Sequence, residues 1–324
     1  MKILVTGGVG YIGGFMTKRL LDDGHEVVVA DSLERGHEDA FDKRAVLEKG
    51  DLRDKTFVSN LFSDVHYDGV IHFAAYISMG ESMENPYLYF SNNIQASLNI
   101  IEEMIQRGQN NFIFSSTAGV YGNPAQIPIP ENHAKNPENP YGESKLMVEK
   151  ILSWYAKTKN FSYVALRYFN ACGAALDGSI GEQHNPESHI IPNIMRALLE
   201  KRAFHLFGID YQTPDGTCIR DYIHVLDLVD AHVLALQKII KDSGSYAYNV
   251  GTGVGYSNKD VIEMVKQISN QPIQIENKPR RPGDADILVA DVQAIRKDLQ
   301  FVPQHSDLRT IVESAWKWHS KLKM

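Results

Sequence analysis

A tyrosine and a lysine stand four residues apart in the segment NPYGESK at 139–145, as Tyr141 and Lys145. This spacing places both side chains on one face of a helix. A phenol has a pKa of about 10, so it serves as a base near neutrality only where its anion is stabilised. A neighbouring ammonium favours the phenolate, so the pair predicts a general base with a lowered pKa. Because the same spacing also occurs on ordinary exposed helices, the interpretation depends on the other motifs.

The chain begins with a glycine-rich turn between a strand and a helix. An apolar run at 2–6 leads into Gly7, Gly10 and Gly13, and apolar residues at helical spacing follow. Glycines at this spacing let the backbone approach a diphosphate closely and let the helix pack on the sheet. The positive end of the helix then faces the phosphate charge. The pattern predicts a dinucleotide site.

A second apolar strand, at 26–31, ends in Asp31, eighteen residues after Gly13. An acid at this distance accepts hydrogen bonds from the adenosine ribose and repels a 2′-phosphate. The motif therefore favours NAD over NADP, and the nearby Arg35 is the feature that keeps NADP open.

Composition excludes several other classes of function. The 324 residues are 43% hydrophobic and carry a net charge of −7, which argues against nucleic-acid or membrane-surface binding. Cys172 and Cys218 are too few for a disulfide framework, and no Cys/His cluster has metal-ligand spacing, so no metal is expected. No apolar run reaches the ~18 residues of a membrane span, and no signal peptide is evident, so the protein is expected to be cytoplasmic.

Strand-like and helix-like segments alternate through the first half of the chain. Helices are expected at 92–107 and 141–157, and strands at 2–6, 26–31, 45–50, 69–74, 111–116 and 162–167. This alternation predicts an α/β fold with a Rossmann-type doubly wound parallel sheet. Ligands bind such sheets beyond the carboxyl ends of the strands, where the motifs fall.

After Asn170 the alternation stops. A loop is expected at 171–189, helices at 190–201, 225–241 and 306–321, a strand at 246–250, and an irregular stretch before Asp221. These later residues predict a smaller, partly interleaved substrate-binding domain. The expected division is an NAD-binding domain of 1–170, to which 222–250 returns, and a nucleotide-sugar-binding domain of 171–221 and 251–324.

Longer motifs connect the chain to a known family. They are TGGVGYIG at 6–13, SSTAGVYG at 115–122, YGESKLMVE at 141–149, RYFN at 167–170, RDYIHVLDL at 220–228 and PRRPGD at 279–284. Through them the chain resembles the extended short-chain dehydrogenase/reductase superfamily and, within it, the UDP-glucose 4-epimerases. The resemblance extends from residue 1 to about residue 320. The glycine turn and the Tyr/Lys pair mark only the superfamily, whereas the last three motifs are specific to nucleotide-sugar epimerases.

The resemblance implies a reaction and its participants. Bound NAD takes a hydride from carbon 4 of a UDP-hexose, the 4-keto sugar turns over, and the hydride returns to its other face. Tyr141 would be the base, Lys145 would bind the nicotinamide ribose and lower the pKa of Tyr141, and Thr117 would hydrogen-bond the reacting oxygen. A UDP-sugar substrate and a homodimer are implied as partners.

The resemblance also assigns binding residues by position. The cofactor contacts are Gly7, Gly10, Tyr11, Ile12, Gly13, Asp31, Ser32, Asp51, Leu52, Phe73, Ala74, Asn92, Ser115, Tyr141, Lys145 and Phe169. The substrate contacts are Thr117, Asn170, His189, Ile190, Phe207, Arg220, Tyr222, Arg281, Asp284 and Leu288. Arginine is suited to paired phosphate contacts, which fits Arg220 and Arg281, although either alone would read as a surface salt bridge.

Three positions depart from the family pattern. Ile77 stands where some epimerases carry lysine, and His189 stands where asparagine is frequent. Leu288 occupies a position that is tyrosine in some relatives and small in others, which leaves the substrate range open, including UDP-N-acetylhexosamines and other UDP-sugars.

Two further functions compete with epimerisation. A nucleotide-sugar 4,6-dehydratase needs an added acid and base, and Ala118 and Gly119 stand where dehydratases carry an Asp-Glu pair. A non-catalytic NAD-sensing protein would not need Tyr141, Lys145 and Thr117 together. The motifs therefore favour the epimerase.

Overall fold

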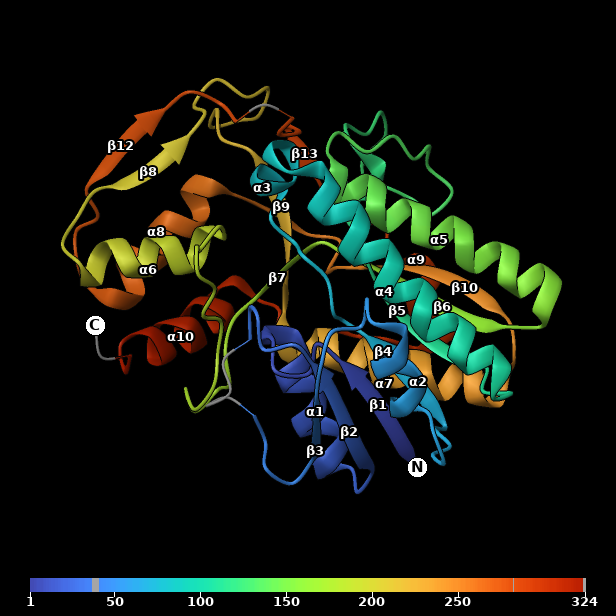
Figure 1. The fold of residues 1–324 in the computed structure, drawn as a ribbon. Coiled ribbons are helices and arrows are strands. Elements are labelled where there is room, and N and C mark those ends of the chain that lie inside the picture. The colour runs from blue at the N-terminus through green and yellow to red at the C-terminus, as the bar shows by residue number, and fades with distance from the viewer. Residues whose placement is uncertain (37–40, 282, 323–324) are drawn as a thin grey trace. The chain divides into compact units, whose positions relative to one another are not determined.

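The computed structural model describes residues 1–36, 41–281 and 283–322, and Figure 1 labels its helices and strands in chain order. These residues group into two units. The first unit is Met1–Val120, Lys135–Arg167 and Val229–Tyr248, and the second is Tyr121–Ala134, Tyr168–Leu228 and Asn249–Met324. The second unit includes 121–134, 168–170, 222–228 and 249–250, whereas the sequence-based division placed these four segments in the NAD-binding domain.

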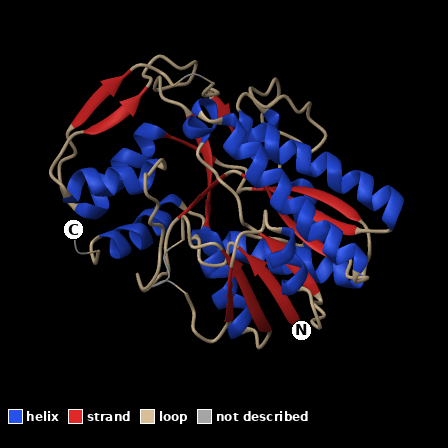
Figure 2. Ribbon diagram, viewed as in Figure 1, coloured by secondary structure: helices blue, strands red, loops and turns tan. Residues whose placement is uncertain are grey.

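Seven strands form the main sheet, in the order β10-β6-β5-β4-β1-β2-β3 (Figure 2). Their bounds are β1 Lys2–Thr6, β2 Glu26–Asp31, β3 Val46–Lys49, β4 Gly69–His72, β5 Asn111–Thr117, β6 Ser162–Tyr168 and β10 Ser245–Val250. Strand β1 lies in the interior of the sheet, next to the central β4, and pairs in parallel with both β2 and β4. The predicted doubly wound α/β fold is confirmed.

The helices of this half are α1 Tyr11–Asp22, α2 Lys55–Leu61, α3 Met79–Glu84, α4 Pro86–Gln106, α5 Pro140–Lys159 and α7 Val225–Lys241. Helices α4 and α5 pack side by side (Figure 1). Each begins with an asparagine cap and a proline, since Asn85 accepts from Leu88 N and Asn139 from Gly142 N. Proline is suited to the first helical position because its missing N–H has no partner there anyway.

The core beneath α4 and α5 is apolar and comes from strands and helices together. Leu4, Val70 and Phe112 of the sheet pack with Ile100 of α4 and Val148 of α5, and none of them is measurably exposed. Burial of these apolar side chains is the main contribution that stabilises the packing of the two helices on the sheet. It holds the start of α5, which carries Tyr141, in a set position over the sheet.

The second unit has short strands and its own core. Its elements are η2 Ala118–Tyr121 (which begins in the first unit), β7 Asn170–Cys172, α6 Ile190–Leu199, β8 Phe204–Phe207, β9 Ile219–His224, β11 Gly255–Ser257, α8 Asn258–Ser269, β12 Ile275–Lys278, β13 Ile287–Leu288, α9 Gln293–Leu299 and α10 Leu308–His319. Strand β9 is central, between β11 and β13, and also pairs with β7. Strands β8 and β12 form a separate pair. Ile194, Val261 and Ile311 join α6, α8 and α10 in one apolar cluster.

The structure corrects two expectations in this unit. The segment 171–189 was expected to be loop, but it continues β7 and holds a bridge between Ala174 and Gly181. The stretch before Asp221 was expected to be irregular, but it contains β8 and the start of β9. Such strands are too short to show a clear apolar period. Among the described helices, none combines the length and apolarity that crossing a bilayer requires.

Candidate active site

The glycine turn has the close approaches that the sequence predicted. Gly7 has a φ of +70°, and a Cβ there would lie 2.7 Å from Ala74 N. A Cβ at Gly13 would lie 2.1 Å from Gly7 O. Gly10 caps α1 without any side-chain hydrogen bond to the first amides of the helix. The turn therefore admits only glycine at Gly7 and Gly13, and it offers helix N-terminal amides to an anion.

Asp31 ends β2 and is 8% exposed. Its two oxygens accept from Val9 N at 3.1 Å and from Leu33 N at 2.9 Å. Burial raises the pKa of Asp31, while these two amides act in the opposite direction. Each carboxylate oxygen keeps a further lone pair, so the group can still accept from ribose hydroxyls.

Arg35, the residue that kept NADP open, has other partners. Its guanidinium is 2.8 Å from Glu81 Oε1 and stands 5.0 Å from the centre of the Tyr76 ring. The first contact is an exposed ion pair with α3, and the second is with a tyrosine that precedes this helix. This arrangement supports the preference for NAD.

The side chains of the predicted adenine contacts, Asp51 and Leu52, already contact other residues of the chain. Both oxygens of Asp51 bond to Arg53, with the shortest contact at 2.6 Å. Leu52 packs in the core at 5% exposure, and its carbonyl accepts from Asn99 Nδ2 at 2.8 Å. Any adenine contact at Leu52 would therefore involve its backbone amide. Ser32 accepts weakly from Glu34 N at 3.4 Å and stays a predicted ribose contact.

Tyr141, Lys145 and Thr117 lie together in the first unit. Tyr141 and Lys145 occupy the first two turns of α5, and Thr117 ends β5. Tyr141 and Thr117 share a side-chain hydrogen bond. Thr117 Oγ1 also accepts from Gly119 N at 3.1 Å, so it caps the backbone as well. The expected catalytic set is thus brought together by one helix and one neighbouring strand.

Lys145 is buried, with 2% of its surface exposed. Its ammonium donates to Ser115 O at 2.8 Å and stands 5.0 Å from the centre of the Phe114 ring. Burial lowers the pKa of Lys145 to about 7. An ammonium has three donors, so this group retains donors for a ribose after its contact with Ser115.

Burial and a neighbouring hydroxyl act in opposite directions on the pKa of Tyr141. Burial raises the pKa of Tyr141, and the hydrogen bond with Thr117 offsets only part of that rise. The ammonium of Lys145 donates to the backbone of β5, and its expected effect on the pKa of Tyr141 stays a prediction. In the chain alone, Tyr141 is therefore a weaker acid than a free phenol, and a further positive charge is needed to favour its anion.

Polar residues behind α5 set its position. Asn93 on α4 donates from Nδ2 to Ser144 Oγ at 3.0 Å and accepts from Tyr76 N at 2.9 Å. Asn92, the predicted cofactor contact, is partly buried and donates to Asn93 Oδ1 at 3.1 Å. The sequence prediction did not include Asn93. Its signal was only an apolar helix face interrupted by an amide.

His72 is buried where β4 ends. Its Nδ1 is 2.7 Å from Thr6 Oγ1, and its Nε2 is 3.0 Å from Ser97 Oγ. Burial, with a contribution from the charge of Lys145, lowers the pKa of His72 to about 3. The imidazole is therefore neutral and joins β1, β4 and α4 as a structural link.

The remaining predicted cofactor residues lie in both units. Ala74 contacts the glycine turn at Gly7, and the ring of Phe73 is 4.9 Å from that of His232. Phe169 belongs to the second unit, where its amide donates to Val250 O at 3.1 Å. Tyr11 and Ile12 are the first two residues of α1. Their roles toward the cofactor stay predictions.

A second set of predicted residues gathers in the second unit around Arg220. Its side chain is 10% exposed, and its Nη2 is 3.9 Å from Asp284 Oδ1. Arg281 Nε is 3.0 Å from Asp284 Oδ2, and its guanidinium stands 5.4 Å from the Phe207 ring centre. Leu288 on β13 pairs with Arg220 on β9. Pro282, which belongs to the PRRPGD motif, lies outside the described residues.

Asn170 and Tyr222 face each other across β7 and β9. Tyr222 is 1% exposed, burial raises the pKa of its hydroxyl, and that oxygen has no hydrogen-bond partner among the described residues. A buried hydroxyl without a partner costs about 1–3 kcal/mol, which is consistent with a position that a ligand completes.

His189 and Ile190 stand where α6 begins. His189 is the N-cap residue, but its side chain makes no capping bond. Its Nδ1 contacts Glu182 Oε1 instead. Burial disfavours the charge on His189, yet the carboxylate of Glu182 outweighs this effect and raises its pKa.

The chain is similar to a known protein family and to a named relative. Residues 3–251 match the family described as "NAD dependent epimerase/dehydratase family". A UDP-glucose 4-epimerase of Streptococcus mutans is 46% identical over 323 residues, which cover 99% of this chain and 97% of the relative.

Solved structures agree with this relation. The UDP-glucose 4-epimerase of Brucella ovis in complex with NAD has a TM-score of 0.94 at 40% identity, covering 97% of each chain. The UDP-Glc/GlcNAc 4-epimerase of Campylobacter jejuni has a TM-score of 0.86 at 39% identity, covering 99% of each chain. The similarity therefore includes both units.

Proposed function

The chain belongs to the NAD dependent epimerase/dehydratase family, and from this premise we propose that it interconverts UDP-glucose and UDP-galactose at carbon 4. The observation that carries the proposal is the group formed by Tyr141, Thr117 and Lys145 in the same unit as the glycine turn. A hydroxyl, a phenol and a buried ammonium are the groups needed to move a proton at a secondary alcohol.

The chain's own residues fit NAD. Gly7 and Gly13 leave room that any Cβ would fill, and the start of α1 presents amides to a diphosphate. Asp31 keeps lone pairs for ribose hydroxyls, and Lys145 keeps donors for the nicotinamide ribose. When bound, NAD supplies the acceptor and donor of the hydride at carbon 4, together with a cationic ring.

Tyr141 is the residue that exchanges the proton. Its phenolic oxygen accepts the proton of the carbon-4 hydroxyl and returns it when the sugar is reduced on the other face. Thr117 holds the reacting oxygen by a hydrogen bond and already shares one with Tyr141. Because burial raises the pKa of Tyr141, the phenolate forms only when positive charge is added to the site.

The second unit holds the UDP part of the substrate. Arg220 and Arg281 bind the diphosphate, and both already share the carboxylate of Asp284. An arriving diphosphate replaces or joins this carboxylate, and charge-assisted contacts of this kind are about twice as strong as neutral ones. Phe207 is 37% exposed and offers its ring to the uracil. Asn170, Tyr222, His189, Ile190 and Leu288 complete the proposed contacts.

The substrate range follows from Leu288. A leucine in place of tyrosine leaves space beside the sugar, so UDP-N-acetylglucosamine and UDP-N-acetylgalactosamine are secondary substrates. The observation that favours this second activity is the similarity to the Campylobacter jejuni enzyme, whose name includes both UDP-Glc and UDP-GlcNAc. A 4,6-dehydratase is disfavoured because Ala118 and Gly119 in η2 supply neither acid nor base.

The decisive experiment incubates the protein with UDP-galactose without added NADH and separates the sugar nucleotides. Formation of UDP-glucose at an equilibrium ratio that is independent of starting substrate supports the proposal. A 4-keto-6-deoxy product would identify a dehydratase, and unchanged UDP-galactose with retained NAD would indicate an NAD-binding protein without this activity.

A homodimer that works in the cytoplasm is the remaining part of the proposal. Both features rest on the family resemblance. Light scattering of the purified protein gives its molar mass, and a value near 36.4 kDa would identify a monomer and contradict the dimer.

A further inference from the structure

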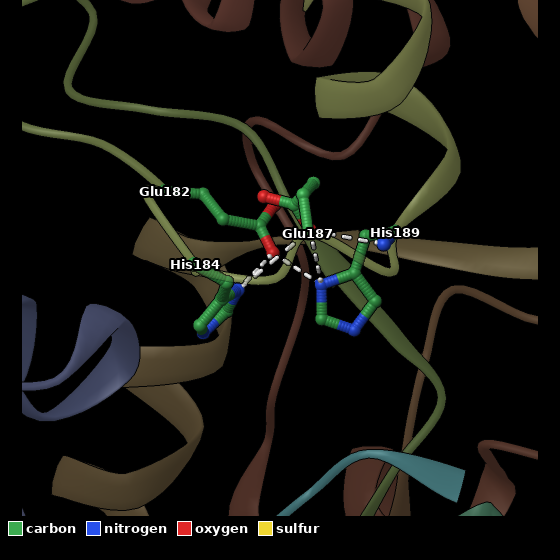
Figure 3. A group of neighbouring side chains, drawn as sticks. All are labelled: Glu182, His184, Glu187 and His189. Carbon is green, nitrogen blue, oxygen red and sulfur yellow. Dashed lines mark hydrogen bonds and ion pairs between the residues drawn. The ribbon is translucent and has the colours of Figure 1, made fainter. Parts of the chain in front are cut away.

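The segment between β7 and α6 gathers four side chains that are common metal ligands. They are Glu182, His184, Glu187 and His189, and one ligand atom from each lies within 4.8 Å of all the others. Figure 3 shows the two imidazoles turned toward the carboxylates from a single stretch of chain. The sequence prediction of no metal rested on Cys and His spacing, so a mixed Glu/His pattern was not considered.

The spacing of these atoms fits a small cation. His184 Nδ1 is 3.0 Å from Glu182 Oε1 and 3.9 Å from Glu187 Oε1, and His189 Nδ1 is 3.8 Å from Glu187 Oε1. Metal bonds of about 2.0–2.2 Å in a tetrahedral site separate neighbouring ligands by roughly 3.3–3.6 Å. The distances lie on both sides of this range. Only the close contact between His189 and Glu182 must open.

Burial makes the two carboxylates costly without added positive charge. The side chains of Glu182 and Glu187 are 3% and 1% exposed. Glu187 Oε2 is buried and has no hydrogen-bond partner among the described residues. Arg196 Nη2 stays 4.0 Å from it and donates instead to His184 O at 2.8 Å. This ion pair with Arg196 is long, so the buried carboxylate of Glu187 keeps capacity for a further positive partner.

We propose that Glu182, His184, Glu187 and His189 bind one divalent transition-metal ion of the Zn²⁺ class. Two imidazole nitrogens and two carboxylate oxygens suit zinc, whereas calcium and magnesium prefer sites made of oxygen alone. The double positive charge of the ion neutralises the two carboxylates, and both imidazoles bind it in their neutral form. The competing arrangement is a metal-free cluster in which protons on both imidazoles supply this charge.

The bound ion has a structural role at the start of α6. It links Glu182, His184 and Glu187 to His189, the N-cap residue of the helix. The side chain of His189 makes no capping bond. Coordination through Nδ1 fixes the tautomer, so Nε2 carries the remaining hydrogen on each histidine. The side chain of His189 is 41% exposed.

The test measures metal binding on the full chain, independently of epimerase activity. Protein treated with a chelator is titrated with Zn²⁺ alone by calorimetry, and with Co²⁺ alone while visible absorption is recorded. We expect one ion per chain, intense visible bands typical of four-coordinate Co²⁺, and a higher Tm with Zn²⁺. Absence of Zn²⁺ binding at micromolar concentration would overturn the proposal and identify the proton-balanced cluster.

Two variants locate the site. His184→Ala removes a ligand, and Glu187→Gln keeps the size of the side chain while removing charge. Each substitution should weaken Zn²⁺ binding by more than about 100-fold. Mutation of a residue that only hydrogen-bonds to a metal ligand already lowers metal affinity by about 10–100-fold, and these two residues are ligands themselves. Circular dichroism checks folding, and the near-isosteric Glu187→Gln keeps the test informative if His184→Ala fails to fold.

The matched control is His205→Ala, because it removes another histidine paired with a carboxylate. His205 Nε2 is 3.1 Å from Glu276 Oε2, but both side chains are about half exposed. The His205→Ala variant should bind Zn²⁺ with the same affinity as the parent protein. Equal affinity in His184→Ala, Glu187→Gln and the parent would place the ion elsewhere and refute the assignment.

Discussion

The proposed catalytic residues of the first unit and the proposed UDP-binding residues of the second are held in different ways. Lys145 is 2% exposed and is bonded to the backbone of β5. Arg281 is 54% exposed on its side chain and is held by the single carboxylate of Asp284, which it shares with Arg220. The first set is embedded in the core, whereas the second combines the largely buried Arg220 and Asp284 with Arg281, an exposed arginine held by an ion pair.

This difference indicates what each set must do. A proton-transfer group has to keep its geometry and its pKa throughout turnover, which burial among fixed dipoles provides. A substrate-binding network has to open for each diphosphate, and exposed ion pairs are worth only about 0–1 kcal/mol, so they are readily exchanged. Substitutions should therefore separate turnover from affinity, unit by unit.

The largest effect is expected from Tyr141→Phe. The ring remains and packs as before, but the proton acceptor is lost, so turnover should fall ~10²–10⁴-fold. Fold and bound NAD should be unchanged. The measurement is conversion of UDP-galactose together with the NAD content of the protein. Tyr155→Phe on the same helix, whose hydroxyl bonds to Glu102, is the control and should keep its activity. Near-normal turnover in Tyr141→Phe would show that Tyr141 is not the base.

Arg281→Leu should act on affinity instead. Loss of a charge-assisted contact leaves diphosphate oxygens without a partner, so UDP binding should weaken by ~2–4 kcal/mol while NAD binding stays the same. Calorimetry with UDP measures this loss. Arg309→Leu, at an exposed pair with Glu313 in the same unit, is the control. If UDP affinity is equal in Arg281→Leu and the parent, the second set does not bind the diphosphate.

Lys145→Met should abolish turnover but stabilise the fold. The buried ammonium is disfavoured at neutral pH, so replacing it with an apolar chain of similar length should add about 1–3 kcal/mol to the free energy of unfolding. Chemical denaturation measures this gain. The exposed Lys150 on α5 gives the control, since Lys150→Met should change stability little.

The stabilisation in Lys145→Met should also depend on pH. Lys145 has a pKa of about 7 in the folded chain. The unfolded value is about 10.4. Between these values the unfolded chain binds more protons, so the stability of the parent rises with pH. The advantage of Lys145→Met should be complete below pH 7 and vanish near the unfolded pKa. A constant difference across this window would mean that Lys145 is not buried as a cation.

The smallest effect concerns substrate choice. Leu288→Tyr should exclude the N-acetylated sugars while sparing the simple hexoses, since one size change in an apolar pocket discriminates by ~1–3 kcal/mol. The ratio of kcat/KM for the two substrate pairs measures it. Ile287→Tyr adds the same ring to the opposite face of β13 and is the control. Equal losses on both pairs in Leu288→Tyr would show that Leu288 supports the fold.

Several features were predictable because each has a local sequence signal. The glycine spacing at 6–13, the acid at Asp31 and the Tyr141/Lys145 spacing are local patterns, and the doubly wound fold and the family follow from them and from the longer motifs. Local patterns suffice there because a turn, a strand end and a helix face each have a fixed period.

Other features depended on contacts between residues far apart in the chain. The hydrogen bond from Asn93 to Ser144 and the burial that raises the pKa of Tyr141 are two examples. Burial and the direction of a side chain depend on what packs against it, and pKa values depend on the resulting loss of solvent. The residues alone therefore identified the chemistry and the family, whereas tertiary packing set which groups are charged, satisfied or in need of a partner.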